Sequence, residues 1–99
     1  MQPTFLNFKD STISTAINID KITHFDMNED YIHLIIFFGE KNRRFTLAKE
    51  LENDAQINTL LRNLAKEIYY QCVYYPTCNS DIDFGNKEFI DKLLKEVYE

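Results

Sequence analysis

The chain has 99 residues and a formal net charge of −5 at pH 7, with eight Phe and six Tyr but only two Gly and two Pro. This length suits a single domain over residues 1–99 with one hydrophobic core. The negative charge argues against direct, non-specific nucleic-acid binding, which needs clustered Lys and Arg. The scarcity of Gly leaves little material for a phosphate-binding loop.

The sequence also disfavours membrane insertion and export. No apolar run approaches the roughly 20 residues of a membrane-spanning helix. The first residues lack the basic-then-apolar pattern of a secretory signal. We therefore expect a cytoplasmic protein that does not bind membranes, with its acidic residues spread over a solvated surface.

The first half of the chain, residues 1–47, has the composition of β-strands. Loose alternation predicts one strand over residues 4–9 and a second over 12–19, joined by a turn at 9–11. Residues 31–38 form the most β-prone octet. Their nearly continuous apolar character predicts a central strand that is covered on both faces.

The polar segment 28–30 is predicted to join two strands of a β-hairpin. A two-residue loop would set Phe25 opposite Leu34 on the core face. A four-residue loop would keep the same faces and set His24 opposite His33. No Asn-Gly or Asp-Gly pair fixes the loop length, and we prefer the shorter loop.

A turn at 39–42 and a fifth strand at 43–47 complete the predicted β-region. Alternation sends Arg43 and Arg44 to opposite faces of this strand. One is expected to be a surface charge and the other to pair with a carboxylate.

Helical periodicity begins after the fifth strand. A helix over 53–75, capped by Asn53 or Asp54, is followed by a loop at 76–86 and a second helix over 86–98 capped by Asn86. The apolar stripe of the first helix consists of Ile57, Leu60, Leu61, Leu64, Ala65, Ile68 and Cys72. Its opposite, solvated side is predicted to carry Asn58, Arg62, Asn63, Lys66 and Glu67.

The predicted fold is therefore α+β: a five-stranded antiparallel β-meander followed by two C-terminal α-helices packed on the sheet.

Few side chains are candidates for catalysis or metal binding. His24 and His33, with Asp26 nearby, could supply a general acid or base in a cleft between sheet and helices. A metal site would need further ligands, so no metal or cofactor is expected. Cys72 and Cys78 lack zinc spacing and are expected to be free thiols, with a disulfide as the alternative if the protein is oxidised.

The remaining candidates form interaction surfaces. Exposed Tyr is a favoured anchor at protein interfaces, although the tyrosines here could instead seal the joint between the helices. The acidic candidates would face a basic partner. The predicted interaction surface comprises Asp26, Glu29, Asp30, Tyr70, Tyr74, Tyr75, Asp81 and Asp83.

These observations favour a small, non-catalytic protein–protein interaction module. A regulator, or a phage or mobile-element inhibitor of a host defence complex, would fit this class, with a protein partner that has a basic surface. One alternative is a small-molecule-binding or enzymatic domain that uses the cleft near His24 and His33. Another is a self-associating subunit, paired through the last helix or a sheet edge.

Overall fold

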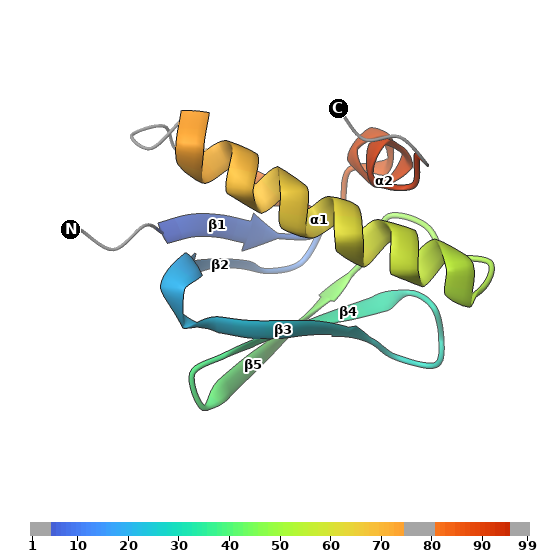
Figure 1. The fold of residues 1–99 in the computed structure, drawn as a ribbon. Helices are drawn as coiled ribbons and strands as arrows, with labels where there is room; N and C mark the ends of the chain where they lie inside the picture. Colours follow the sequence, from blue (N-terminus) through green and yellow to red (C-terminus); the bar gives the residue numbers. More distant parts are fainter. Residues whose placement is uncertain (1–4, 75–80, 96–99) are drawn as a thin grey trace.

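The computed structural model describes residues 5–74 and 81–95, and within them the chain has an α+β fold, as predicted (Figure 1). In chain order the elements are β1 (Phe5–Lys9), β2 (Ser14–Asn18), the 3-10 helix η1 (Ile19–Lys21), β3 (Ile22–Met27), β4 (His33–Phe38), β5 (Lys41–Thr46), α1 (Asp54–Tyr74), β6 (Asp81–Asp83) and α2 (Lys87–Leu93).

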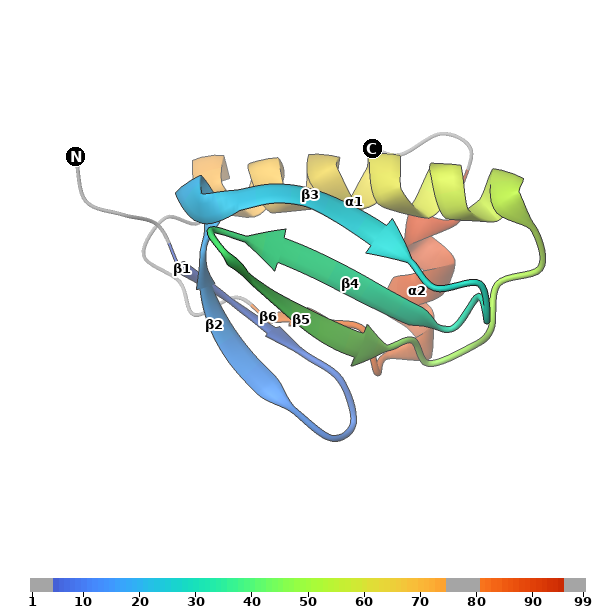
Figure 2. The ribbon, with the colours of Figure 1, turned by 90° about the horizontal axis from the view of Figure 1, so that it is seen from below.

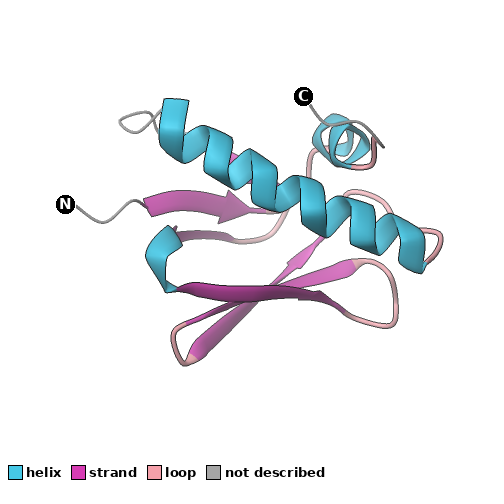
Figure 3. Ribbon diagram, viewed as in Figure 1, coloured by secondary structure: helices cyan, strands magenta, loops and turns pink. Residues whose placement is uncertain are grey.

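The five predicted strands and two helices are present (Figure 3), but the strands do not form one continuous meander, because they divide between two three-stranded sheets ordered β2-β1-β6 and β3-β4-β5. The break lies at η1, between β2 and β3. The side chain of Asn18 accepts a hydrogen bond of 3.0 Å from the N–H of Asp20 and starts this turn. The carbonyl of Lys21 then accepts the N–H of Gly39 at 2.8 Å, which fixes the chain beside the second sheet.

The segment 76–86, predicted as a loop, contains the sixth strand. β6 runs parallel to β1, with Phe8 opposite Ile82. Its three residues contain a single apolar side chain, too little for a periodic signal. The strand is instead specified by contacts distant in sequence, including an ion pair of 3.4 Å between Lys9 and Asp81.

The β3–β4 hairpin follows neither expected register. Met27 lies opposite Leu34, and His24 lies opposite Phe37, because the connection is centred between Asp30 and Tyr31, one residue later than the shorter expected loop. The predicted faces are nevertheless right, since Leu34 and its face neighbours pack into the core. A register shift by an even number of residues preserves the faces of both strands.

β4 is central in its sheet, as predicted, but it is covered on one face only. Leu34 and Ile36 are fully buried, whereas Ile35 and Phe37 on the other face are half-buried. β5 begins at Lys41, two residues earlier than predicted. Gly39 adopts φ 60°, the left-handed conformation that lets a two-residue turn close the hairpin.

A single hydrophobic cluster contains residues of both sheets and both helices. Phe8 of β1, Phe45 of β5 and Phe84 after β6 are fully buried. Their ring centroids are 6.4 Å apart for Phe8 and Phe45, 6.3 Å for Phe8 and Phe84, and 5.2 Å for Phe45 and Phe84. Helix α1 extends along one side of the two sheets, with α2 beside it (Figure 2).

Both helices begin at the predicted caps. Asn53 accepts the N–H of Gln56 at 2.9 Å, and Asn86 accepts the N–H groups of Glu88 and Phe89. Helix α2 is shorter than the predicted 86–98 and ends at Leu93. The last predicted residues, 96–98, lie outside the described part of the chain.

The predicted solvated side of α1 is partly wrong, because Asn63 and Glu67 are buried, with exposures of 0% and 5%. The amide nitrogen of Asn63 donates to the carbonyls of Leu93 at 2.7 Å and Lys95 at 2.8 Å. Asn63 thus satisfies carbonyls at and just beyond the end of α2, which is why its polar side chain is tolerated at a buried position. Glu67 lies 3.2 Å from the ammonium group of Lys92.

Replacing Asn63 by Ala should destabilise the protein by about 1–3 kcal/mol, because two carbonyls would lose a buried donor. Urea denaturation followed by circular dichroism measures this change as a lower midpoint. The control Asn58→Ala, at an exposed position of the same helix, should leave the midpoint nearly unchanged. An equal, small effect of both substitutions would contradict the role of Asn63.

Candidate interaction surfaces

The β3–β4 loop is held by the carboxylate of Asp30. One oxygen accepts the N–H of Ile32 at 3.1 Å and the N–H of His33 at 3.2 Å, and the other bonds to the ring of His33. The side-chain hydrogen bond with His33, followed by the backbone bonds, lowers the pKa of Asp30. Asp30 therefore remains ionised while it shapes the loop.

Tyr31 attaches this loop to the start of α1. Its hydroxyl donates to Asp54 at 2.8 Å, and its carbonyl accepts the N–H of Leu51 at 2.7 Å. The hydrogen bond and the charge of Asp54 raise the pKa of Tyr31. Tyr31 also adopts φ 61°, which is rare for a residue with a side chain. These contacts explain why the loop is centred between Asp30 and Tyr31 and not at either predicted position.

The loop and the helix start together form an acidic end of the molecule, composed of Asp26, Glu29, Asp30 and Asp54, all exposed. Asp54 was missed as a surface residue because its sequence context predicts only a helix cap. Asp26 accepts the N–H of Met27 at 2.8 Å, and this short-range bond leaves its carboxylate at the surface.

Asp81 and Asp83 do not join the acidic end. They lie on β6, well away from the β3–β4 loop (Figure 2). Asp81 pairs with Lys9, and Asp83 accepts the N–H of Gly85 at 2.9 Å. The predicted acidic residues thus divide into two separate groups.

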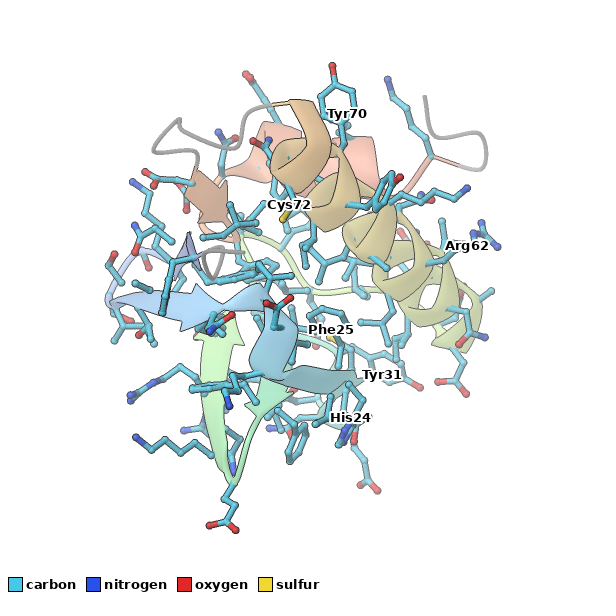
Figure 4. All side chains as sticks on the ribbon, turned by 60° about the vertical axis from the view of Figure 1, so that its left-hand side comes forward. His24, Phe25, Tyr31, Arg62, Tyr70 and Cys72 are labelled. Carbon is cyan, nitrogen blue, oxygen red and sulfur yellow. The ribbon has the colours of Figure 1, made fainter. Side chains whose placement is uncertain are left out.

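The tyrosine cluster is described only in part. Tyr70 is 43% exposed and points away from the protein (Figure 4). Tyr69 belongs to the same group of tyrosines but not to the predicted interaction surface, and it is 69% exposed. Tyr74 closes α1, but its side chain lies outside the described part, as does all of Tyr75.

The two cysteines are not seen as a pair, because Cys78 lies outside the described residues. Cys72 is half-buried, on the side of α1 that packs against the hydrophobic cluster. Burial, together with the charge of Asp20, raises the pKa of the Cys72 thiol and keeps it protonated.

The histidines are not brought together as the catalytic alternative requires. His24 stacks on Phe37, with ring centroids 4.2 Å apart, and His33 bonds to Asp30 instead of Asp26. Among the described residues, no group of three or more His, Cys, Asp or Glu could hold a metal ion.

The structure has a groove of about 430 Å³ at a different place, between the end of β2 and the β4–β5 turn. This edge groove, as we call it, is lined by Phe5, Ala16, Ile17, Asn18, Lys21, Phe38, Gly39, Glu40 and Lys41. Phe5 is 58% exposed at its rim. Neither His24 nor His33 lines it, and sequence periodicity alone gave no indication that these segments would meet.

Asp10 joins the two sheets at the other end of β5. One of its oxygens accepts the N–H of Thr46 at 2.7 Å, and the other accepts the N–H groups of Thr12 at 2.7 Å and Ile13 at 2.9 Å. Partial burial raises the pKa of Asp10, but these hydrogen bonds outweigh it, so that the pKa lies below its ordinary value.

Because the pKa of Asp10 is lower in the folded than in the unfolded state, its contribution is complete above the ordinary value of about 3.8 and is lost as the pH falls through the folded-state value. Asp10→Asn should therefore destabilise the protein at pH 7, and the difference from wild type should shrink on acidification below pH 3.8. Urea denaturation midpoints, measured from pH 7 to below pH 3.8, report this difference in stability, and Glu50→Gln at an exposed position is the control. A difference independent of pH would refute the role of the charge.

Comparison of the chain with family models, with curated proteins and with solved structures finds no match. No α-helix in the described ranges is both long and apolar enough to cross a membrane.

Proposed function

We propose that this chain is a non-catalytic protein-binding module whose acidic end docks on a basic surface of a partner protein. A regulator or an inhibitor of a host complex, including one encoded by a phage or mobile element, acts in this way. The observation that carries the proposal is the β3–β4 loop, where exposed carboxylates stand on a backbone held from both sides by Asp30 and Tyr31.

The fixed loop matters because binding normally costs free energy for ordering mobile groups. A loop ordered by its own hydrogen bonds avoids part of that cost. Its charge adds long-range attraction, which raises the association rate with a basic surface and weakens with salt.

The carboxylates have different tasks in this proposal. Asp30 and Asp54 hold the loop through hydrogen bonds, so their replacement would change its shape. Glu29 has no hydrogen-bond partner among the described residues, and Asp26 bonds only to the next N–H along the chain. Glu29 and Asp26 are therefore the residues with which to test partner contact without disturbing the fold.

The test is affinity capture from the native host with three baits. They are the wild type, the double variant Asp26→Lys/Glu29→Lys, and the control Glu88→Lys at an exposed position of α2. Mass spectrometry identifies a stoichiometric partner of the wild type, and its affinity is then measured at low and high salt. The double reversal should weaken binding by about tenfold or more and flatten the salt dependence, whereas Glu88→Lys should not.

Unchanged affinity of the double variant would contradict docking through the acidic end. Thermal unfolding of each bait by circular dichroism verifies that the substitutions leave the fold intact.

A further inference from the structure

β5 is the last strand of its sheet, so one of its edges has no neighbouring strand in the described structure. In an antiparallel pair, residues alternate between those bonded to the partner strand and those whose N–H and C=O point away from it. The two-residue turn makes Phe38 and Lys41 a bonded pair, and Arg43 is bonded next. Asn42 and Arg44 therefore present their backbone groups at the free edge.

The far half of this edge is closed by the other sheet. The N–H of Thr46 donates to Asp10 at 2.7 Å, and the N–H of Ala48 donates to the carbonyl of Phe84 at 2.8 Å. Within the described ranges, the backbone N–H groups of Asn42 and Arg44 have no such acceptor. An unpaired strand edge is a template for another strand, and only this half of it remains open.

The edge groove adjoins the open half. Its apolar part comes from Phe5, Ile17 and Phe38, and its second wall is β2, which is also an edge strand. Figures 1 and 2 show the end of β2 and the β4–β5 turn at the same end of the molecule, which is where the groove lies. The volume of about 430 Å³ falls within the roughly 300–1,000 Å³ typical of ligand pockets.

The groove is locally basic in a chain with a net charge of −5. Lys21 and Lys41 line it, and Glu40 is the carboxylate of its lining. Arg43 lies on the same face of β5 as Lys41. Among the described residues, Lys21, Lys41 and Arg43 form no ion pair. Arg44 forms none within the same ranges, so the carboxylate partner expected for one of the two arginines is not seen there.

We propose that the edge groove binds an extended acidic peptide segment of a partner protein, which pairs as an added strand with Asn42 and Arg44. Backbone hydrogen bonds to an exposed edge provide affinity in this mode, and alternate side chains provide specificity. Carboxylates of the peptide meet Lys41 and Lys21, and its apolar side chains cover Phe38. This surface is separate from the acidic end and does not depend on the function proposed for it.

The test uses Glu-Val-Glu-Val-Glu-amide with fluorescein on its N-terminal amine as the probe, with fluorescence anisotropy as the readout. The peptide should bind wild type, and binding should weaken with salt. Lys41→Glu should lower its affinity by about tenfold or more. The matched control, Lys66→Glu, places the same charge change at an exposed position of α1 and should leave the affinity within about twofold.

The backbone pairing is tested separately from the charge. Asn42→Pro removes an edge N–H without removing a bond to β4 or a charge, so the protein should fold and lose peptide binding. Should this variant fail to fold, the same peptide N-methylated at every residue, so that neither edge offers an N–H group, answers the question on wild-type protein. It keeps the charge but cannot pair as a strand, and it should bind at least about tenfold more weakly.

Three results would overturn the proposal: absence of binding to wild type, equal binding of Lys-Val-Lys-Val-Lys-amide with the same N-terminal fluorescein, or equal binding of the N-methylated peptide. Sedimentation provides a further one. A wild-type dimer that Asn42→Pro converts to a monomer would show that a second copy of the chain occupies the edge, in place of an acidic peptide.

Discussion

The contact among Phe8, Phe45 and Phe84 is the interaction on which the rest of the structure depends. The two sheets share no strand pairing, and these three buried rings are where β1, β5 and the segment after β6 meet. Such rings bury large apolar areas and prefer tilted or offset arrangements. Close to these rings, Asp10 bonds to Thr46, and Phe84 bonds to Ala48. We call this junction between the two sheets the seam, and it combines apolar packing with hydrogen bonds.

The seam also explains the position of the edge groove. The sheets are fixed to each other at the end of β5 by Asp10, and at the start of β3 by the bond between Lys21 and Gly39. Between these two points the edges of β2 and β5 are not paired, and the edge groove lies in that interval. The acidic end is built independently, by contacts between the β3–β4 loop and α1. The molecule thus carries two surfaces of opposite charge that can be altered separately.

The sequence predicted what depends on local pattern. The α+β class, the faces of β3 and β4, and the caps Asn53 and Asn86 all follow from periodicity or from residues next to one another. It failed where contacts distant in sequence decide the structure. β6 forms because β1 offers an edge, Asn63 is buried because α2 ends against it, and the hairpin register follows from Tyr31 reaching Asp54. The candidate surfaces show the same division. The charged residues can be identified from the sequence, but the sequence does not show which of them lie together in the fold.

The measurement that tests this account most directly is amide hydrogen exchange along β5, followed by NMR under native conditions. A seam that closes only half of the strand edge predicts fast exchange at Asn42 and Arg44. Slow exchange is expected at Arg43 and Phe45, which bond to β4, and at Thr46, which bonds to Asp10. Protection of Asn42 and Arg44 as strong as that of their neighbours, in a protein shown to be monomeric, would contradict the open edge and with it the account of how the two sheets are joined.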